Sequence, residues 1–186
     1  LILPGQGHFG TAMERLHSRG FVSYLRHRLG RENPNRPPFL GICLGLQILF
    51  EGSEESPGIE GLGLYPGTVR RFPTRIENRR LIVPLMGWKK TETVRGSRPG
   101  IFAPTTPLRE DPWWYFVHSY FVPARLFFPN SDILLTALET WYGVPFTAAI
   151  ADPPLYATQF HPEKSGREGL ELLRRFVETT KRFLQT

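Results

Sequence analysis

Apolar residues form short continuous runs in some parts of the chain and recur at helical spacing in others. The run at residues 1–3 predicts the end of a buried strand, and the Pro4-Gly5-Gln6-Gly7 stretch after it predicts a turn. Helical spacing over residues 13–29 predicts an amphipathic helical segment that is broken near Gly20 and ends at Gly30. The chain therefore opens as strand, turn and helix.

A second unit of the same kind follows. After a predicted loop at residues 33–38, the apolar run at 39–42 predicts a strand. From Cys43 the spacing becomes helical and places three apolar side chains on one side, namely Leu46, Leu49 and Phe50. Residues 51–63 are rich in Gly, Glu and Ser and predict a loop.

The remaining chain contains several short apolar runs separated by turn residues, without helices between them. Strands are expected at 67–72, 81–85, 115–118, 133–138, 147–150 and 155–160. A helix is expected from about Ser165, with a buried stripe of Leu170, Leu173, Val177 and Leu184. Close strand spacing favours antiparallel hairpins, so we predict an α/β fold whose mixed, mostly parallel sheet is flanked by helices and extended by antiparallel strands.

Length and composition narrow the class of protein. A chain of 186 residues, 22% of them charged, is typical of an ordinary globular protein and predicts one domain over 1–186. The apolar runs are too short to span a bilayer as helices, and the N-terminus lacks the pattern of a secretory signal. A single cysteine forms no internal disulfide, which favours a cytoplasmic location.

The net charge of +6 raises a second class of function. Basic residues gather locally at Arg70, Arg71, Arg75, Arg79 and Arg80. A nucleic-acid-binding module is therefore an alternative, although no recognised binding motif accompanies the charge.

Cys43 stands in the motif Gly41-Ile42-Cys43-Leu44-Gly45, the thiol counterpart of a G-x-S-x-G nucleophile elbow. A position at a helix N-terminus would lower the pKa of the thiol, and the amide N–H of Leu44 could face a developing oxyanion. The alternative is a small buried cysteine between two packing glycines.

His161 and Glu163 follow an apolar strand and lie two residues apart. In an extended segment their side chains would share one face, so that Glu163 would orient the imidazole. An ordinary surface ion pair is the alternative. Together with Cys43 they predict acyl transfer. A second oxyanion donor is expected from the backbone around Gly5, Gln6 and Gly7, where a plain structural turn is the other interpretation.

These motifs together resemble the class I glutamine amidotransferases, in particular the glutaminase subunits of imidazole glycerol phosphate synthase in histidine biosynthesis. The resemblance runs almost end to end. It is carried by LPGQGHFG (3–10), PFLGICLGLQ (38–47), GLGLYPGTVRRF (61–72), MGW (86–88), FVHSY (116–120) and QFHPEKS (159–165).

The resemblance implies hydrolysis of glutamine through a Cys thioester, with ammonia passed to a (β/α)₈ cyclase subunit that makes imidazole glycerol phosphate and AICAR. It implies no metal, no cofactor and no nucleic-acid or membrane partner, and low activity without the synthase subunit. The implied residues are the triad Cys43, His161 and Glu163; the oxyanion-hole backbone of Gln6 and Leu44; the glutamine-binding Gly7, Gln47, Ser119 and Tyr120; and the partner-facing Met86, Trp88 and Lys164.

The sequence departs from the family at three places. A strand, a helix and a second strand that normally precede the turn are absent, so a truncated sequence with exposed apolar sheet edges is expected. Gln6 stands where Val is commoner, and Lys89 where Asn is usual, which could alter contacts with the synthase subunit.

Other class I amidotransferases, serving anthranilate, guanylate, cytidine nucleotide or pyridoxal phosphate synthesis, share the triad and remain alternatives, as does a triad-bearing scaffold without activity. The motifs at 61–72 and 118–120 favour the histidine-pathway subunit.

Overall fold

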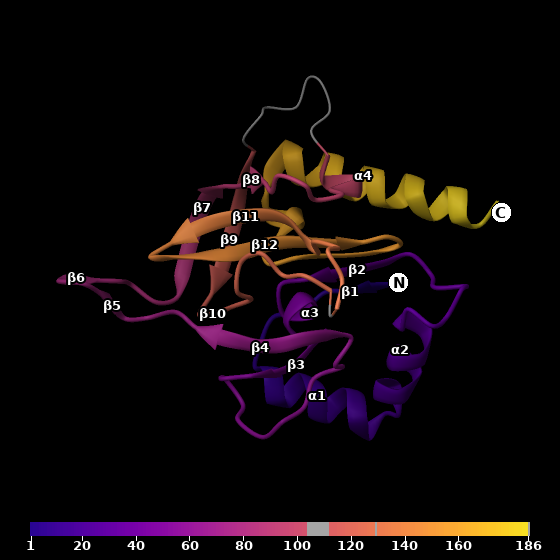
Figure 1. The fold of residues 1–186 in the computed structure, drawn as a ribbon, viewed down its shortest axis with the longest axis horizontal. Helices are drawn as coiled ribbons and strands as arrows, with labels where there is room; N and C mark the ends of the chain where they lie inside the picture. The colour runs from indigo at the N-terminus through magenta and orange to yellow at the C-terminus, as the bar shows by residue number, and fades with distance from the viewer. Residues whose placement is uncertain (104–111, 129, 186) are drawn as a thin grey trace.

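A six-stranded mixed sheet forms the centre of the computed structural model, which describes residues 1–103, 112–128 and 130–185 (Figure 1). The strand order is β1-β2-β13-β12-β11-β8. Their bounds are β1 (Ile2–Leu3), β2 (Phe39–Ile42), β13 (Leu155–Thr158), β12 (Val144–Asp152), β11 (Thr136–Tyr142) and β8 (Glu92–Thr93). The first three are parallel, and β12, β11 and β8 continue the sheet antiparallel, which confirms the predicted fold class.

The parallel strands are buried on both faces. Every residue of β2 and β13 is buried, as expected when helices cover both sides of a parallel sheet. Helices α1 (Phe9–Ser18) and α2 (Phe21–Leu29) lie on one side of the sheet in Figure 1, and α4 (Gly166–Phe183) lies on the other. The predicted break falls at Gly20, whose φ of 72° ends α1 and starts α2, and α2 ends at Gly30 as predicted.

The predicted buried stripe of α4 is wrong. Leu172 and Phe176 face the core, whereas Leu170 and Leu184 are 69% and 78% exposed. Val177 is also exposed and Leu173 is half-buried against the core. The apolar residues of the helix lie on two neighbouring arcs, and the arc with Leu172 and Phe176 packs against the core.

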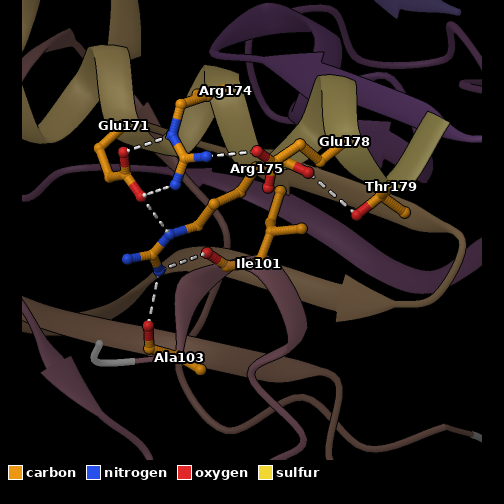
Figure 2. Close-up of polar contacts among 7 residues, drawn as sticks. All are labelled: Ile101, Ala103, Glu171, Arg174, Arg175, Glu178 and Thr179. Carbon is orange, nitrogen blue, oxygen red and sulfur yellow. Dashed lines mark hydrogen bonds and ion pairs between the residues drawn. The ribbon is translucent and has the colours of Figure 1, made fainter. Parts of the chain in front are cut away.

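Helix α4 is fastened to the short 3₁₀ helix η1 (Gly100–Phe102) by a charged network (Figure 2). Glu171 accepts hydrogen bonds from Arg174 and Arg175, and Arg174 also pairs with Glu178. Arg175 donates to the carbonyls of Ile101 and Ala103 at 3.1 and 2.7 Å. These bonds satisfy the end of η1 and keep it against the helix.

Smaller sheets surround the central one. They comprise β10 (Tyr120–Phe121), β4 (Tyr65–Arg71) and β3 (Phe50–Ser53) in one sheet, the ribbon of β7 (Leu85–Lys90) and β9 (Trp113–His118), and the projecting hairpin of β5 (Arg75–Ile76) and β6 (Arg79–Arg80). Of the residues predicted as a strand at 81–85, only Leu85 is in one, because β7 begins there. Helix α3 (Leu44–Gln47) is one turn long, so Phe50 begins a strand and does not continue the predicted helix, and β3 replaces the start of the predicted 51–63 loop.

A buried charge cluster joins the strands to the loop after α2. Both oxygens of the Asp152 carboxylate accept from Arg31, at 2.5 and 3.1 Å. The carboxylate also accepts from Arg36 at 3.0 Å and from the Tyr65 hydroxyl at 3.1 Å. Burial, reinforced by the Asp152 charge, raises the pKa of Tyr65 well above its usual value. Asp152 therefore holds three separate elements together.

In the part of the chain that the structure describes, edge strand β1 pairs with β2 alone. Leu1 before the strand and Ile2 within it are about half exposed. Within the described residues, no helix is both long and apolar enough to cross a membrane.

Candidate active site

Cys43 lies at a sharp turn between β2 and α3. Its φ of 53° is in the left-handed region, which is uncommon for a residue with a side chain. A Cβ on Gly45 would lie 2.1 Å from the Leu3 carbonyl oxygen, and one on Gly41 would lie 2.6 Å from the Gly45 carbonyl oxygen. The two flanking glycines thus let β1, β2 and α3 approach closely while the cysteine side chain is held on the turn.

A cavity of about 280 Å³ opens at Cys43. It brings together residues that are far apart in the sequence, including every predicted oxyanion and glutamine-binding residue. Its lining is Gln6, Gly7, Cys43, Leu44, Gln47, Glu55, Pro84, Val117, His118, Ser119 and Tyr120. Neither His161 nor Glu163 is in this lining.

His161 is buried, and its Nδ1 lies 2.7 Å from Oε1 of the half-exposed Glu163. Since a carboxylate accepts, Nδ1 carries the proton, and a neutral ring has its lone pair on Nε2. No hydrogen-bond partner of Nε2 occurs in the described parts of the chain. The structure therefore pairs His161 with Glu163 but forms no hydrogen bond between the imidazole and the thiol.

The contact between His161 and Glu163 differs from the expected one. Pro162 starts the 3₁₀ helix η2 (Pro162–Lys164), so Glu163 reaches the imidazole from a helical turn and not from an extended strand. The Ser165 hydroxyl fixes this turn by donating to the His161 carbonyl at 2.6 Å and accepting from the Tyr115 N–H at 3.0 Å.

The pKa of the Cys43 thiol also differs from the sequence prediction. Burial raises the pKa of Cys43 to about 12, against the smaller lowering effects of the Leu44 amide and the Gln159 side chain. The predicted decrease is wrong because α3 has only four residues and the sulfur is buried. At neutral pH the resting site thus holds a protonated thiol.

The Leu44 amide, which was predicted to face an oxyanion, is hydrogen-bonded within the chain. The Leu44 N–H donates to the Gly5 carbonyl at 3.4 Å, and Gly7 has a φ of 126°. Turning the Gly5–Gln6 peptide would release the Leu44 amide and redirect the Gln6 N–H, a motion that the adjacent glycines make accessible.

Three residues of this region were not predicted. Glu55 is the acidic residue of the cavity lining, and its Oε2 accepts from the Phe9 N–H at 2.7 Å. Burial lowers the pKa of His118 to about 4, and its Nδ1 lies 2.8 Å from the Tyr120 carbonyl. Gln159 Nε2 lies 3.5 Å from the Cys43 sulfur. His118 and Gln159 stand in the motifs at 116–120 and 159–165, which gave a sequence signal, whereas Glu55 stands in none of the motifs.

Two of the three predicted partner-facing residues, Trp88 and Lys164, lie beside the Tyr115 ring. Exposed Met86 and Trp88 project from β7, and the Trp88 ring packs edge-on against Tyr115 with centroids 6.0 Å apart. Lys164 Nζ lies 6.0 Å from the same ring. Lys89 instead faces the Tyr142 ring at 5.1 Å, so its alternate position on β7 directs it away from Trp88.

Other sites contribute no comparable chemistry. A larger cavity of about 620 Å³ is lined by Arg31, Tyr65 and Asp152 among others, and contains none of the predicted site residues. Among residues 1–103, 112–128 and 130–185, no group of three or more His, Cys, Asp or Glu side chains is placed to hold a metal ion.

Comparison with known proteins supplies independent information. The family model described as glutamine amidotransferase class-I matches residues 1–179. The Thermus thermophilus protein named imidazole glycerol phosphate synthase subunit HisH is 46% identical over 181 residues, covering 96% of this chain and 78% of that protein. The Emericella nidulans protein named imidazole glycerol phosphate synthase hisHF is 39% identical over 180 residues, covering 96% of this chain and 31% of that protein.

The fold has solved counterparts. A crystal structure described as glutamine amidotransferase matches with a TM-score of 0.62 at 19% identity, covering 97% of this chain and 78% of that one. At this identity the likeness concerns the fold alone.

Proposed function

We propose that this chain, which belongs to the class I glutamine amidotransferase family, hydrolyses glutamine to glutamate and ammonia at Cys43. The observation that supports this most is the cavity in which the thiol meets Gly7, Gln47, Ser119 and Tyr120. His161 takes the proton of the Cys43 thiol, and the thiolate attacks the side-chain amide carbon. The same proton is passed to the amide nitrogen as the C–N bond breaks, so that ammonia leaves and a thioester remains. Water then hydrolyses the thioester with His161 as base and Glu163 as its orienting group.

Stabilisation of the tetrahedral oxyanion is assigned to the backbone N–H groups of Gln6 and Leu44. Because the Leu44 N–H is bonded to Gly5 in the resting structure, this assignment requires the Gly5–Gln6 peptide to turn. Two further features support a site that is incomplete at rest. Burial raises the pKa of the Cys43 thiol, and His161 Nε2 has no hydrogen-bond partner among the residues that the structure describes. The isolated chain is a resting form, and we assign completion of its site to the partner and substrate.

The partner is the (β/α)₈ cyclase subunit of imidazole glycerol phosphate synthase, in histidine biosynthesis in the cytoplasm. Relatives with that synthase name support the assignment. The exposed Met86, Trp88 and Lys164 offer an apolar and basic docking face beside the His161 turn. An enclosed route from this face protects ammonia, which would be protonated in neutral water. A glutaminase assay with this barrel, compared with other amidotransferase synthase subunits, tests the choice.

Glu55 is assigned to the α-ammonium group of glutamine. It supplies a carboxylate to the cavity. Gln47 adds its Oε1 as an acceptor, because its Nε2 already donates to the Tyr120 carbonyl and to Gln159 Oε1. Glu55→Gln should raise KM for glutamine roughly tenfold or more through loss of a charge-assisted bond, with kcat changed less than about threefold. Steady-state kinetics with the synthase subunit measure both constants.

The control for this change is Glu14→Gln on the exposed face of α1. It removes the same charge away from the cavity and should leave KM unchanged. An unchanged KM in Glu55→Gln would contradict the assignment.

Trp88→Ala tests the docking face. A large aromatic anchor at an interface typically contributes about 2 kcal/mol, so the Kd for the synthase subunit should rise roughly 30-fold. Calorimetric titration of the two subunits measures it. Phe21→Ala is a matched control, because Phe21 is 46% exposed against 48% for Trp88 and lies on α2, at the other side of the molecule (Figure 1). Equal Kd values for the two variants would exclude this face.

A further inference from the structure

A continuous polar chain lies beneath the cavity and ends at the nucleophile. Gln159 follows β13, is fully buried, and is fixed at its backbone by donation from its N–H to the Ala148 carbonyl at 2.8 Å. Its side chain lies between two cavity residues. Its Oε1 accepts from Gln47 Nε2 at 3.1 Å, and its Nε2 lies 3.5 Å from the Cys43 sulfur.

The Tyr120 carbonyl determines which group donates in each of these hydrogen bonds. A carbonyl only accepts, so Gln47 must present Nε2 to it, at 2.9 Å. The same Gln47 nitrogen then donates to Gln159, which must present Oε1. The Nε2 of Gln159 is left facing the sulfur. Turning either amide by 180° would oppose two donors or two acceptors.

The His118 ring holds the Tyr120 carbonyl in place. Its Nδ1 donates to the Tyr120 carbonyl at 2.8 Å, and it packs against the rings of Phe72, Phe116 and Phe146. The acceptor that orients Gln47 is thus held by a rigid, aromatic environment.

We propose that Gln159 is a positioning residue for Cys43: its Nε2–H donates to Sγ, holds the sulfur at the cavity and stabilises its thiolate. The proposal rests on the proposed function of Cys43. A buried thiolate needs hydrogen-bond donors in place of water, and charged acceptors form the stronger bonds. Besides the Leu44 amide, Gln159 is the group that acts on the thiol in this sense.

Two substitutions test the proposal. Gln159→Glu keeps the shape but places an acceptor beside the sulfur, and Gln159→Met removes the donor without adding charge. Cys43 is the single cysteine of the chain, so alkylation by iodoacetamide reports on it directly. For each unit by which the pKa of the thiol rises, the fraction of thiolate at pH 8 falls tenfold. Because a more basic thiolate is also more nucleophilic, the rate of alkylation at pH 8 should fall by about threefold or more.

Glutamine hydrolysis with the synthase subunit is the second readout. In both variants kcat should fall about tenfold or more, with KM within about threefold of the parent value, because Gln159 does not line the cavity. Gln185→Glu, at an exposed position after α4, makes the same change elsewhere and should match the parent chain in both assays.

A third measurement leaves Gln159 in place and does not depend on the folding of the Gln159 variants. The glutamines are at positions 6, 47, 159 and 185, so ¹⁵N labelling of their side-chain amides gives a simple spectrum. The amide proton of Gln159 that is bonded to the sulfur should lie downfield at neutral pH in the parent chain and should move upfield in Cys43→Ala, where the acceptor is absent.

The outcomes separate clearly. Alkylation like that of Gln185→Glu at every pH, or a Gln159 amide signal that is the same in the parent chain and in Cys43→Ala, overturns the proposal. A decrease in kcat without slower alkylation also overturns it, because a merely structural role would do this. Retained turnover in Cys43→Ala would instead refute the proposed function, and alkylation would still report on the Gln159 bond.

Discussion

Cys43→Ala is expected to reduce glutamine hydrolysis at least about a thousandfold in the presence of the synthase subunit. The proposed reaction passes through a thioester on this sulfur, and no other cysteine in the chain can replace it. The buried, tightly enclosed turn tolerates the smaller side chain, so binding of the synthase subunit should not change. Ammonia release and the Kd for the subunit are the two measurements.

Cys43→Ser serves as the matched comparison. It keeps a nucleophilic atom of similar size but with a much higher pKa, and its activity should be close to that of the alanine variant. A glutamine-analogue electrophile should label the parent chain and neither variant. Turnover in Cys43→Ala near the parent rate would refute the mechanism.

Asp152→Ala is expected to produce the largest loss of stability. The change leaves Arg36 buried without its carboxylate and also removes bonds to Arg31 and Tyr65. Removing one partner of a buried ion pair typically costs about 3 to 5 kcal/mol, which corresponds to a decrease in Tm of roughly 6 to 20 °C for a chain of this size. Urea and thermal unfolding measure the two quantities.

Asp132→Ala is the control, because Asp132 is exposed. It should change the free energy of unfolding by less than about 0.5 kcal/mol. A similarly small effect of Asp152→Ala would show that the buried cluster contributes no net stability.

Local sequence patterns were sufficient to predict strand β2 and the turn that holds Cys43. The apolar run at 39–42 matches β2 residue for residue, and glycines 41 and 45 correctly indicated a turn under steric constraint. The break at Gly20 was equally readable, because a glycine with positive φ is a local property of the backbone.

Features that depend on tertiary packing could not be predicted from the sequence. The apolar arcs of α4 are similar in sequence, and the choice between Leu170 and Leu172 is made by the sheet beneath the helix. The raised pKa of Cys43 depends on burial that no single segment provides. Gln159 is 116 residues from Cys43, and Glu55 reaches the cavity from the loop after β3, so their contacts appear only in the folded chain.

The strength of the hydrogen bond between the Leu44 amide and the Gly5 carbonyl limits how much activity can be gained by turning the Gly5–Gln6 peptide. A neutral hydrogen bond contributes about 0.5 to 1.5 kcal/mol, and at 3.4 Å this one belongs to the weaker end. Such an energy corresponds to a population ratio of roughly two to ten between the closed and turned peptide. Activation by a partner beyond about tenfold must therefore come from deprotonating the thiol and aligning His161, with the peptide turn contributing the smaller share.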